Sequence, residues 1–517
     1  MEPLLFANPY MRAATGIAVR YSSHTLCYVD IPDATRAHHC SRAFPSQWIL
    51  RAFSSLTMAI AVHIGLLSGK TATVKADKDE EVEAVSLRAQ TVLGVGRGRL
   101  VDSSGSVLDP CSTVEAAKIQ NGDSLTLHMN KLQIQSSCSA FAAVLGDGSI
   151  STWGAAWSGG DSSSVQPQLK NVLQIQASQG AFAALLGDGS VVTWGSADHG
   201  GDSSAVQDQL KDVQQIQASI GAFAAILGDG SVVTWGPRVW PYNGGDSSAV
   251  QHQLKNVQQI QASQLAFAAI LGNGSVVTWG EAEYGGDSSA VQDQLKDVQQ
   301  IQASGAAFAA VRGDGTVVTW GDADDDYGGD SSAVRNQLKN VQQIQASENA
   351  FAAILGDGTV VTWGAADRGG DSSAVQHQLR NVQQIQSSHH AFAAILGDGS
   401  VVTWGDVRHG SDSRAVRDQL KNVQLIQASG GAFAAILGDG SVVTWGAAHL
   451  GGDSRTVQHR LQTVSQIQAN YGAFAAILGD GSIVTWGGAE FGGDPSAMLE
   501  QQPAKRARAS HDGCAVS

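Results

Sequence analysis

The sequence predicts a mainly β protein in which a β-grasp domain is followed by a β-propeller of about nine short blades. Three observations predict this fold class. Glycine accounts for 60 of the 517 residues against 10 prolines, which suits many tight turns between short strands. A Thr-Trp-Gly motif recurs along the chain at intervals of about 41 residues, the length of a small blade. The first and last repeats are incomplete in complementary ways, which favours a closed ring.

Composition and charge narrow the classes of function. The formal net charge is -15, whereas a nucleic-acid binder usually carries a basic face, so DNA or RNA is not expected as the main partner. No apolar run is long enough for a membrane span, and the N-terminus lacks the pattern of a secretory signal. The 5 cysteines are scattered without a C-x-x-C pair, as in proteins of a reducing compartment. We therefore expect an intracellular protein, cytoplasmic or nuclear.

Residues 1–57 resemble nothing that follows. They hold arginines and serines but few acids and show no clear period, so a transit peptide and a disordered leader or gene-model extension both fit them. The second interpretation is favoured, because the first foldable strand begins directly after Met58, which would then be the start. The tail, residues 503–517, is expected to be disordered, and its short basic stretch Lys505–Arg508 is a weak nuclear signal.

Residues 58–131 are expected to form one compact unit with the element order ββαββ. Alternating apolar residues over 60–66 and the β-rich stretch 71–75 predict a hairpin. An approximate helical stripe runs from Asp79 to Gly94. Its apolar members are Val82, Val85, Leu87 and Val92. Short strands are expected at 100–101 and 124–129.

This unit resembles ubiquitin over residues 60–130. The stretches that fall in register are Leu67–Thr71, Gly98–Val101, Leu108, Ile119–Gly122 and Ser124–His128. The resemblance implies a β-grasp fold with a protein-binding patch, which maps to Leu67, Val101 and His128. Because no Gly-Gly ends the unit, it implies a domain that docks to ubiquitin receptors, ligases or the proteasome and is not conjugated.

Nine near-identical repeats occupy residues 132–502. Each has a phenylalanine in an Ala-Phe-Ala-Ala stretch and a tryptophan in Thr-Trp-Gly. The phenylalanines are Phe141, Phe182, Phe223, Phe267, Phe308, Phe351, Phe392, Phe433 and Phe474, and the tryptophans are Trp153, Trp194, Trp235, Trp279, Trp320, Trp363, Trp404, Trp445 and Trp486. Since all the repeats carry both rings, we interpret them as core.

Each piece of the repeat predicts an element. Ile-Gln-Ala-Ser, Ala-Phe-Ala-Ala-Ile-Leu and Val-Val-Thr-Trp are strands, and Gly-Asp-Gly is the tight turn between the last two. The Ser-Ser-Ala-Val-Gln-Asp-Gln-Leu stretch fits a helical turn or an outer strand, and we expect the outer strand. The repeated Ile-Gln glutamines fit a channel lining or, more plausibly, amide hydrogen bonds between blades.

The two ends of the repeat array indicate whether the repeats form a closed ring. The first repeat opens with its Ile-Gln strand, and the ninth ends with the Gly-Gly-Asp segment that the first lacks. We therefore expect the terminal strands to join in one blade, which removes both sheet edges. An open β-repeat array is the alternative, because nine blades exceed the usual number.

The repeats resemble the regulator of chromosome condensation family. The motif is Asp-Gly-x-Val-x-x-Trp-Gly followed by an aromatic residue or histidine and Gly, as in Tyr284–Gly286 and Phe491–Gly493. Members of that family serve as exchange factors for a small GTPase, chromatin binders, an ultraviolet-B receptor and modules of HECT ubiquitin ligases. The photoreceptor's Gly-Trp-Arg-His-Thr motif is absent, and no HECT domain follows residue 502.

The loops after Trp-Gly are the expected binding sites, because they vary on a repeated framework. The candidates are Trp157, Trp240, Tyr242, Tyr284, Asp324, Asp325, Tyr327, His409 and Phe491. Trp240 and Tyr242 lie in the insert of the third repeat and are typical interface anchors. The aspartates of the fifth repeat fit a cation or basic peptide, although a solvated charge run is favoured. The pair His389-His390 lacks the sequence neighbours that a metal site needs.

No catalytic constellation is found, so an enzyme, a cofactor and a metal site are not expected. The favoured function is a monomeric protein-interaction adaptor. Its propeller loops would bind a protein client, and its ubiquitin-like domain would dock to ubiquitin-pathway components. A guanine-nucleotide exchange factor for a small GTPase and a small-ligand or glycan-binding propeller are the alternatives.

Overall fold

In the computed structural model of the chain, the structure describes residues 59–66, 70–93, 98–128, 132–237, 243–323 and 327–494. The predictions made for residues 1–57 and 503–517 lie outside these ranges. Across the described ranges, no helix combines the length and the apolar character that crossing a bilayer requires.

The N-terminal unit is a four-stranded sheet with one helix. Its elements are β1 Ile60–Gly65, β2 Thr71–Ala76, α1 Val82–Leu93, β3 Arg99–Val101 and β4 Ser124–His128. The strands lie in the order β2-β1-β4-β3, with β1 parallel to β4 and the other neighbours antiparallel. Alternate strand residues such as Val62 and Leu125 form a core with Val85 and Ala89 of the helix. The predicted order ββαββ is therefore confirmed.

The helix buries a different stripe from the predicted one. Val82, Val85, Ala89 and Leu93 are buried, at the three- and four-residue spacing of one helical face. The predicted members Leu87 and Val92 are exposed. The sequence stripe was wrong at these two positions because it combined residues from opposite sides of the helix.

Nine three-stranded antiparallel sheets follow, one for each repeat. The first strands are β5 Gln133–Ser136, β8 Val172–Ala177, β11 Val213–Ala218, β14 Val257–Ala262, β17 Val298–Ala303, β20 Val341–Ala346, β23 Val382–Ser387, β26 Val423–Ala428 and β29 Val464–Ala469. The second strands are β6 Ala140–Val144, β9 Ala181–Leu186, β12 Phe223–Leu227, β15 Ala266–Leu271, β18 Ala307–Arg312, β21 Ala350–Leu355, β24 Ala391–Leu396, β27 Ala432–Leu437 and β30 Ala473–Leu478. The third strands are β7 Ile150–Gly154, β10 Val191–Gly195, β13 Val232–Trp235, β16 Val276–Gly280, β19 Val317–Gly321, β22 Val360–Gly364, β25 Val401–Gly405, β28 Val442–Gly446 and β31 Ile483–Gly487.

Short 3-10 helices fill two kinds of connection. Those directly after a third strand are η1 Ala156–Ser158, η2 Ala197–His199, η4 Asn243–Gly245, η5 Ala282–Tyr284, η7 Ala366–Arg368, η8 Val407–His409, η10 Ala448–Leu450 and η12 Ala489–Phe491. Those further along the connection to the next repeat are η3 Ser204–Gln209, η6 Gln292–Gln294, η9 Arg414–Val416 and η11 Gln458–Arg460.

In the repeats whose Ser-Ser-Ala-Val-Gln segment the structure describes, this segment folds into turns and does not form the predicted outer strand. In the second repeat, the Ser203 hydroxyl donates to the Gln207 side chain at 2.9 Å, which closes a turn. The Gln207 amide then donates to the Val191 carbonyl at 2.9 Å. A side chain thus occupies the edge of the third strand where a fourth strand would pair. The alternative of a helical turn was the better prediction.

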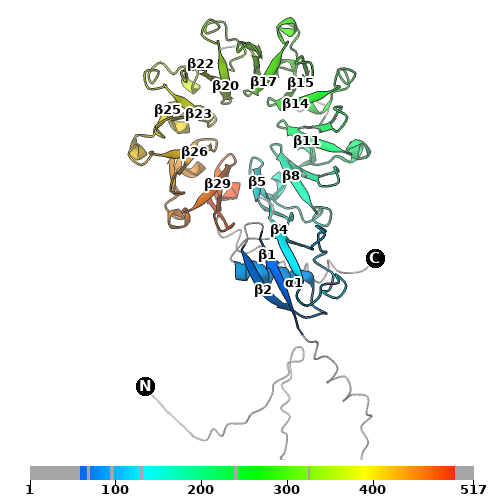
Figure 1. Cartoon of the computed structure of the whole chain (residues 1–517). Coiled ribbons are helices and arrows are strands. Elements are labelled where there is room, and N and C mark those ends of the chain that lie inside the picture. Colours follow the sequence, from blue (N-terminus) through cyan, green and yellow to red (C-terminus); the bar gives the residue numbers. More distant parts are fainter. Residues whose placement is uncertain are drawn as a thin grey trace, which may run out of the picture. The chain divides into compact units, whose positions relative to one another are not determined.

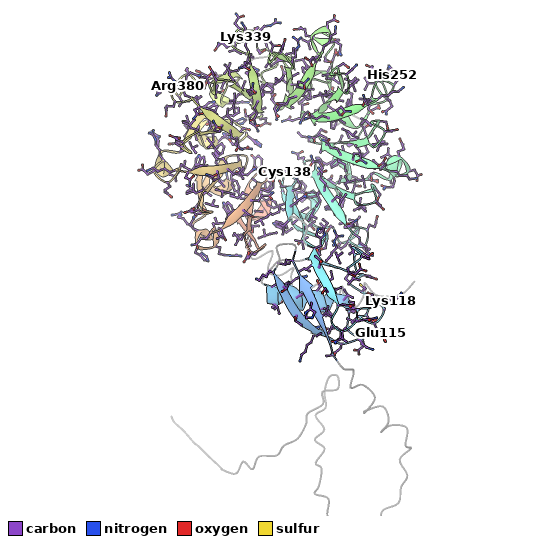
Figure 2. The ribbon with its side chains drawn as sticks, viewed as in Figure 1. Glu115, Lys118, Cys138, His252, Lys339 and Arg380 are labelled. Atoms are coloured by element: carbon purple, nitrogen blue, oxygen red, sulfur yellow. The ribbon has the colours of Figure 1, made fainter. Side chains whose placement is uncertain are left out.

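The blades form a ring with their first strands on the inner side (Figure 1). Neighbouring first strands contact one another around the ring, for example β5 with β8 and β29 with β5. Figure 2 labels Cys138, which follows β5, at the inner rim, and it labels His252, Lys339 and Arg380 at the periphery. The turn segments that hold these three residues therefore lie on the outside.

The core of each blade is a stacked aromatic pair, as predicted. Phenylalanine and tryptophan face each other across the second and third strands, with ring centroids 5.1 to 5.3 Å apart. Between blades, alanines of one second strand pack on the rings of the next. At the junction of blades 1 and 2, Ala140 and Ala142 lie in one cluster with Phe182 and Trp194, and Leu169 of the turn segment completes it.

The ring closes by direct packing of the ninth blade on the first. Ala473 and Ala475 share a core with Phe141 and Trp153. The Ser136 hydroxyl donates to the Ala469 carbonyl at 2.7 Å across the junction. The closed ring was predicted, but a blade shared between both chain ends was not found among the described residues, since all three strands of the first blade come from the first repeat. The open array is excluded.

Candidate binding face and channel mouth

Both variable parts of the repeat lie on one face of the propeller, which we call the variable face. The first strand ends there and the second begins there, so the loop between them has the same location as the loop after the third strand. The Gly-Asp-Gly turns lie at the opposite end of every blade, where Gly189 and its equivalents adopt the positive φ that the turn requires. The two loop segments that differ most between repeats thus lie on one side of the ring.

In most repeats a serine side chain positions the loop of the variable face. In the fourth repeat, the Ser263 hydroxyl donates to the Tyr284 carbonyl at 2.8 Å. Ser304 binds the Tyr327 carbonyl at 2.9 Å, and Ser388 binds the His409 carbonyl at 2.8 Å. In the ninth repeat, the Asn470 amide donates to the Phe491 carbonyl at 2.7 Å. The loop tips are therefore fixed by the blade and present defined side chains.

The candidate loop residues differ in how far they are exposed to solvent. Trp157 is 63% exposed, whereas Tyr284 and Phe491 are half-buried and pack against the inter-blade cores. Tyr327 is half-buried as well. The His409 Nδ1 lies 3.0 Å from a carboxylate oxygen of Asp406, and its ring packs edge-on against His390 with centroids 4.3 Å apart. The predicted residues Trp240, Tyr242, Asp324 and Asp325 lie outside the described residues.

Two further apolar side chains are exposed on the variable face. Val407 of η8 is 65% exposed, and the Tyr471 ring is 42% exposed. Sequence reasoning did not select either residue. Both could have been found by aligning the repeats, because Val407 is a larger side chain where most repeats have alanine, and Tyr471 is a tyrosine at a position whose residue differs in most repeats.

A girdle of backbone hydrogen bonds surrounds the centre of the ring on this face. We call this central opening the channel mouth. The residue after the conserved serine donates its N–H to the carbonyl of the same residue in the next blade. These bonds run from Cys138 to Gln179, Ile220, Gln264, Gly305, Glu348, His389, Gly430 and Tyr471 at 2.8 to 3.3 Å. Because only the backbone forms the girdle, the side chain at this position is free to vary from blade to blade.

Four of the girdle side chains join into a polar arc, which consists of Gln264, Glu348, His389 and Tyr471. The Gln264 amide donates to the Glu348 carboxylate at 2.8 Å, and the His389 Nδ1 lies 3.3 Å from its other oxygen. The rings of His389 and Tyr471 meet edge-on with centroids 5.1 Å apart. The hydrogen bond with His389 lowers the pKa of the Glu348 carboxyl, although partial burial opposes this shift. Glu348 is therefore a carboxylate at neutral pH.

Glycines make the arc possible. Between Gln264 and Glu348 lies Gly305, where a Cβ would come 3.2 Å from the Gln264 amide nitrogen and 2.8 Å from the Glu348 carbonyl oxygen. Between His389 and Tyr471 lies Gly430, where a Cβ would come 3.1 Å from the tyrosine ring. Long side chains thus meet across a blade that contributes no side chain.

The arc does not form a metal site. No group of three or more histidine, cysteine or acidic side chains within the described ranges is arranged to hold a metal ion. His389 has a carboxylate neighbour that the sequence did not suggest, because Glu348 comes from the preceding repeat. Burial lowers the pKa of His390, which favours its neutral form.

Of the predicted inter-blade glutamine bonds, one is found in the described part of the chain. The Gln176 amide donates to the Gln217 side-chain oxygen at 3.3 Å. The Ile-Gln glutamines are half-buried on the first strands, so they also contribute polar surface to the inner side of the ring.

The structure places two of the three patch residues of the N-terminal unit together. Val101 pairs with Thr126, and His128 pairs with Arg99, in the same antiparallel ladder. Because alternate residues share a face, Val101 and His128 lie on the side of the sheet opposite the buried Leu100 and Leu127. Leu67 lies outside the described residues.

Comparison with known proteins finds solved structures that are similar to parts of this chain. No family model and no curated protein sequence matches the chain. Prp20p from Saccharomyces cerevisiae, studied with its binding to Gsp1p and histones, is similar with 16% identity over 51% of this chain and 76% of its own, at a TM-score of 0.32. Human WBSCR16 is similar with 14% identity over 58% and 81%, at 0.31. A designed protein based on ubiquitin is 27% identical over 13% of this chain and 85% of its own, at 0.13.

Proposed function

We propose that the chain is a non-catalytic protein-interaction adaptor whose propeller binds a protein client through the variable face. One observation carries this proposal: the two loop segments that differ most between repeats lie on the same face, and the opposite face repeats the same turn. Loops on a rigid scaffold are the usual carriers of recognition. Exposed Trp157, Val407 and Tyr471 on this face supply the apolar and aromatic anchors that protein interfaces use.

The N-terminal unit would recruit the second partner. Its resemblance to ubiquitin and its sheet order support a docking role for the outer side of β3 and β4, where Val101 and His128 lie. The partners that fit are ubiquitin receptors, ligases or the proteasome. An adaptor of this kind acts inside the cell, so this location is part of the proposal.

The client interaction is tested with the full-length protein as bait and quantitative mass spectrometry. In the test variant, Trp157→Ser is combined with Val407→Ser. The control is Leu173→Ser, which removes an apolar residue that is 51% exposed near the end of the blade with the Gly-Asp-Gly turns. We expect a set of captured proteins that is retained by the control and lost by the test variant. Equal capture by both variants would refute binding through the variable face.

The docking of the N-terminal unit is tested in the same format. His128→Glu adds a charge to the exposed end of β4, and Thr71→Glu adds the same charge on the edge strand β2. Ubiquitin-pathway proteins should be lost with the first change and kept with the second. If the wild-type chain captures no ubiquitin-pathway protein, this half of the proposal is wrong while the client half stands.

A further inference from the structure

The channel mouth on the variable face is a cavity of about 530 Å³ with contributions from all nine blades. Its rim is the girdle position, and the preceding serines and strand ends form the rest of its wall. A cavity of this size lies within the range of sites that bind a single small group, about 300–1,000 Å³. The mouth is therefore large enough for one long side chain with some water.

The charge of the lining favours a cation. Among the described residues that line the cavity, Glu348 is the single carboxylate and none is a lysine or an arginine. The other polar lining groups are hydroxyls, amides, a thiol, an imidazole and a phenol. The whole chain carries a formal net charge of -15, which adds a background field of the same sign.

Glu348 has free capacity to bind such a cation. One of its oxygens accepts a hydrogen bond from Gln264, and the other lies beside His389. A carboxylate offers about four lone-pair sites, so roughly two remain for a ligand. The side chain is 33% exposed, so a ligand in the mouth can reach it. Gln264 and His389 hold the carboxylate in one position before any ligand arrives.

Tyr471 supplies an aromatic wall to the same cavity. It lines the mouth from the ninth blade, and the residue is 42% exposed although its ring contacts those of His389 and Phe491. An aromatic face attracts ammonium and guanidinium groups and packs on the methylene groups that carry them. The arc thus combines a fixed carboxylate with an exposed ring, the two features that a lysine or arginine side chain uses best.

We infer that the channel mouth receives the lysine or arginine side chain at the tip of a loop of the client protein, with Glu348 as counter-ion and Tyr471 as the packing wall. This inference rests on the proposed function and names the chemistry of the client. A projecting tip suits the site, because the mouth is surrounded by the face that carries Trp157 and Val407. The tip would enter the mouth while these residues contact the surface around it.

The test uses the full chain and three capped amino acids as probes, followed by saturation-transfer NMR. The probes are N-acetyl methylamides of arginine, lysine and citrulline, and citrulline is the neutral isostere of arginine. Arginine should bind about tenfold more tightly than citrulline, the smaller gain expected for hydrogen bonds to a charged group. Equal binding of arginine and citrulline by the wild-type protein would overturn the inference without any variant.

Substitutions then test which residues bind the arginine probe. Glu348→Gln should lower the affinity for arginine to that for citrulline. Glu283→Gln makes the same charge change in the exposed η5 loop of the same face and should leave the preference intact. Gly305→Ala should also weaken arginine binding, because the added Cβ displaces Gln264 and Glu348 from each other. A preference that survives in folded Glu348→Gln protein would place the cation elsewhere.

Two further outcomes distinguish a client side chain from a free polyamine, and this inference from the proposed adaptor function. If spermidine binds more tightly than both capped amino acids, the mouth takes a free polyamine and the assignment to a client side chain is wrong. If Trp157→Ser with Val407→Ser abolishes client capture but Glu348→Gln does not change it, the adaptor function stands and this inference fails.

Discussion

The junction where the ring closes differs from the eight junctions inside the chain. Seven buried residues form the core between blades 9 and 1, whereas ten to twelve form each of the others. The described part of the closing junction has no turn-segment leucine equivalent to Leu169 or Leu461. At the other junctions the connecting segment adds a buried leucine to the core, whereas in the described part of the closing junction the core comes from the strands of the two blades, with Phe491 packed against it.

Hydrogen bonds also differ between the junctions. Seven tryptophans donate an indole N–H to a glycine carbonyl of the preceding loop, as Trp363 does to Gly328 at 3.0 Å. Among the described residues, this nitrogen has no hydrogen-bond partner in Trp153 at the closing junction, or in Trp279, which follows the longer loop of the third repeat. The girdle also stops there, since no backbone bond from Tyr471 to Cys138 continues it in the described part of the chain. Gly492 still packs against the Trp153 and Phe141 rings, as its equivalents do in other repeats.

The largest expected effect compares two tryptophans. Trp363→Ala removes a side chain that is 4% exposed and should lower the free energy of unfolding by about 3–5 kcal/mol, from lost burial and packing. Trp153→Ala should cost about 1 kcal/mol less, because Trp153 loses no indole hydrogen bond. Urea denaturation measures both. An equal or greater loss at Trp153 would remove the distinction between the two kinds of junction.

The closing junction should be improvable by restoring the repeat. The ninth repeat has Pro495, Leu499 and Gln502 at the positions of Ser454, Gln458 and Leu461 in the eighth. Replacing all three by the eighth-repeat residues should raise the free energy of unfolding by about 1–2 kcal/mol, since one leucine becomes available for burial. Thermal unfolding measures the gain. The control replaces Glu500, which is equivalent to exposed His459, by histidine and should change little.

Hydrogen exchange should locate the weak point directly. The Gly430 amide donates to the Tyr471 carbonyl at 2.8 Å, whereas the Tyr471 amide has no girdle partner among the described residues. We expect the Tyr471 amide to exchange about tenfold or more faster than the Gly430 amide. Residue-resolved mass spectrometry compares the two sites. Similar protection at both would indicate that the closing junction opens no more readily than its neighbour.

Lowering the pH should produce the smallest of these effects on stability, and it should act away from the closing junction. Burial lowers the pKa of His199 and of His390, which belong to blades 2 and 7, away from the closing junction. Because the unfolded chain binds protons more readily at these groups, stability should be complete above about pH 6.5 and fall as the pH drops through the lowered pKa values. Melting curves at pH 7.5 and 5.5 test this, and His390→Phe should reduce the dependence. Unchanged melting temperatures in the wild-type chain would contradict it.

The repeat pattern predicted most of the propeller because its main buried residues, such as the Phe and Trp rings, recur in every repeat. The Phe and Trp rings, the positive-φ glycine turns and the three strands all followed from repetition. The outer strand was wrong because Ser203 and Gln207 form side-chain bonds whose geometry a strand pattern does not reveal. The helix stripe failed at Leu87 and Val92 because the apolar pattern of α1 is irregular.

The candidate site was predictable only in part. The loops after Trp-Gly were selected by their variation, yet their location on one face depends on strand direction. The polar arc was missed because Gln264, Glu348, His389 and Tyr471 come from four different repeats. An alignment of the repeats would have shown all four residues at the position after the repeated serine. It would not have shown that the glycines at this position in two other repeats leave space for them to meet.

The backbone girdle has an evolutionary consequence. Because peptide groups form the bonds of the girdle, mutation at its positions alters the opening without removing a buried ring or a girdle bond. Selection can therefore change ligand preference by point mutation, one blade at a time, while the fold tolerates the intermediates. Gly305 and Gly430 are the exceptions, since a side chain at either would collide with its neighbours.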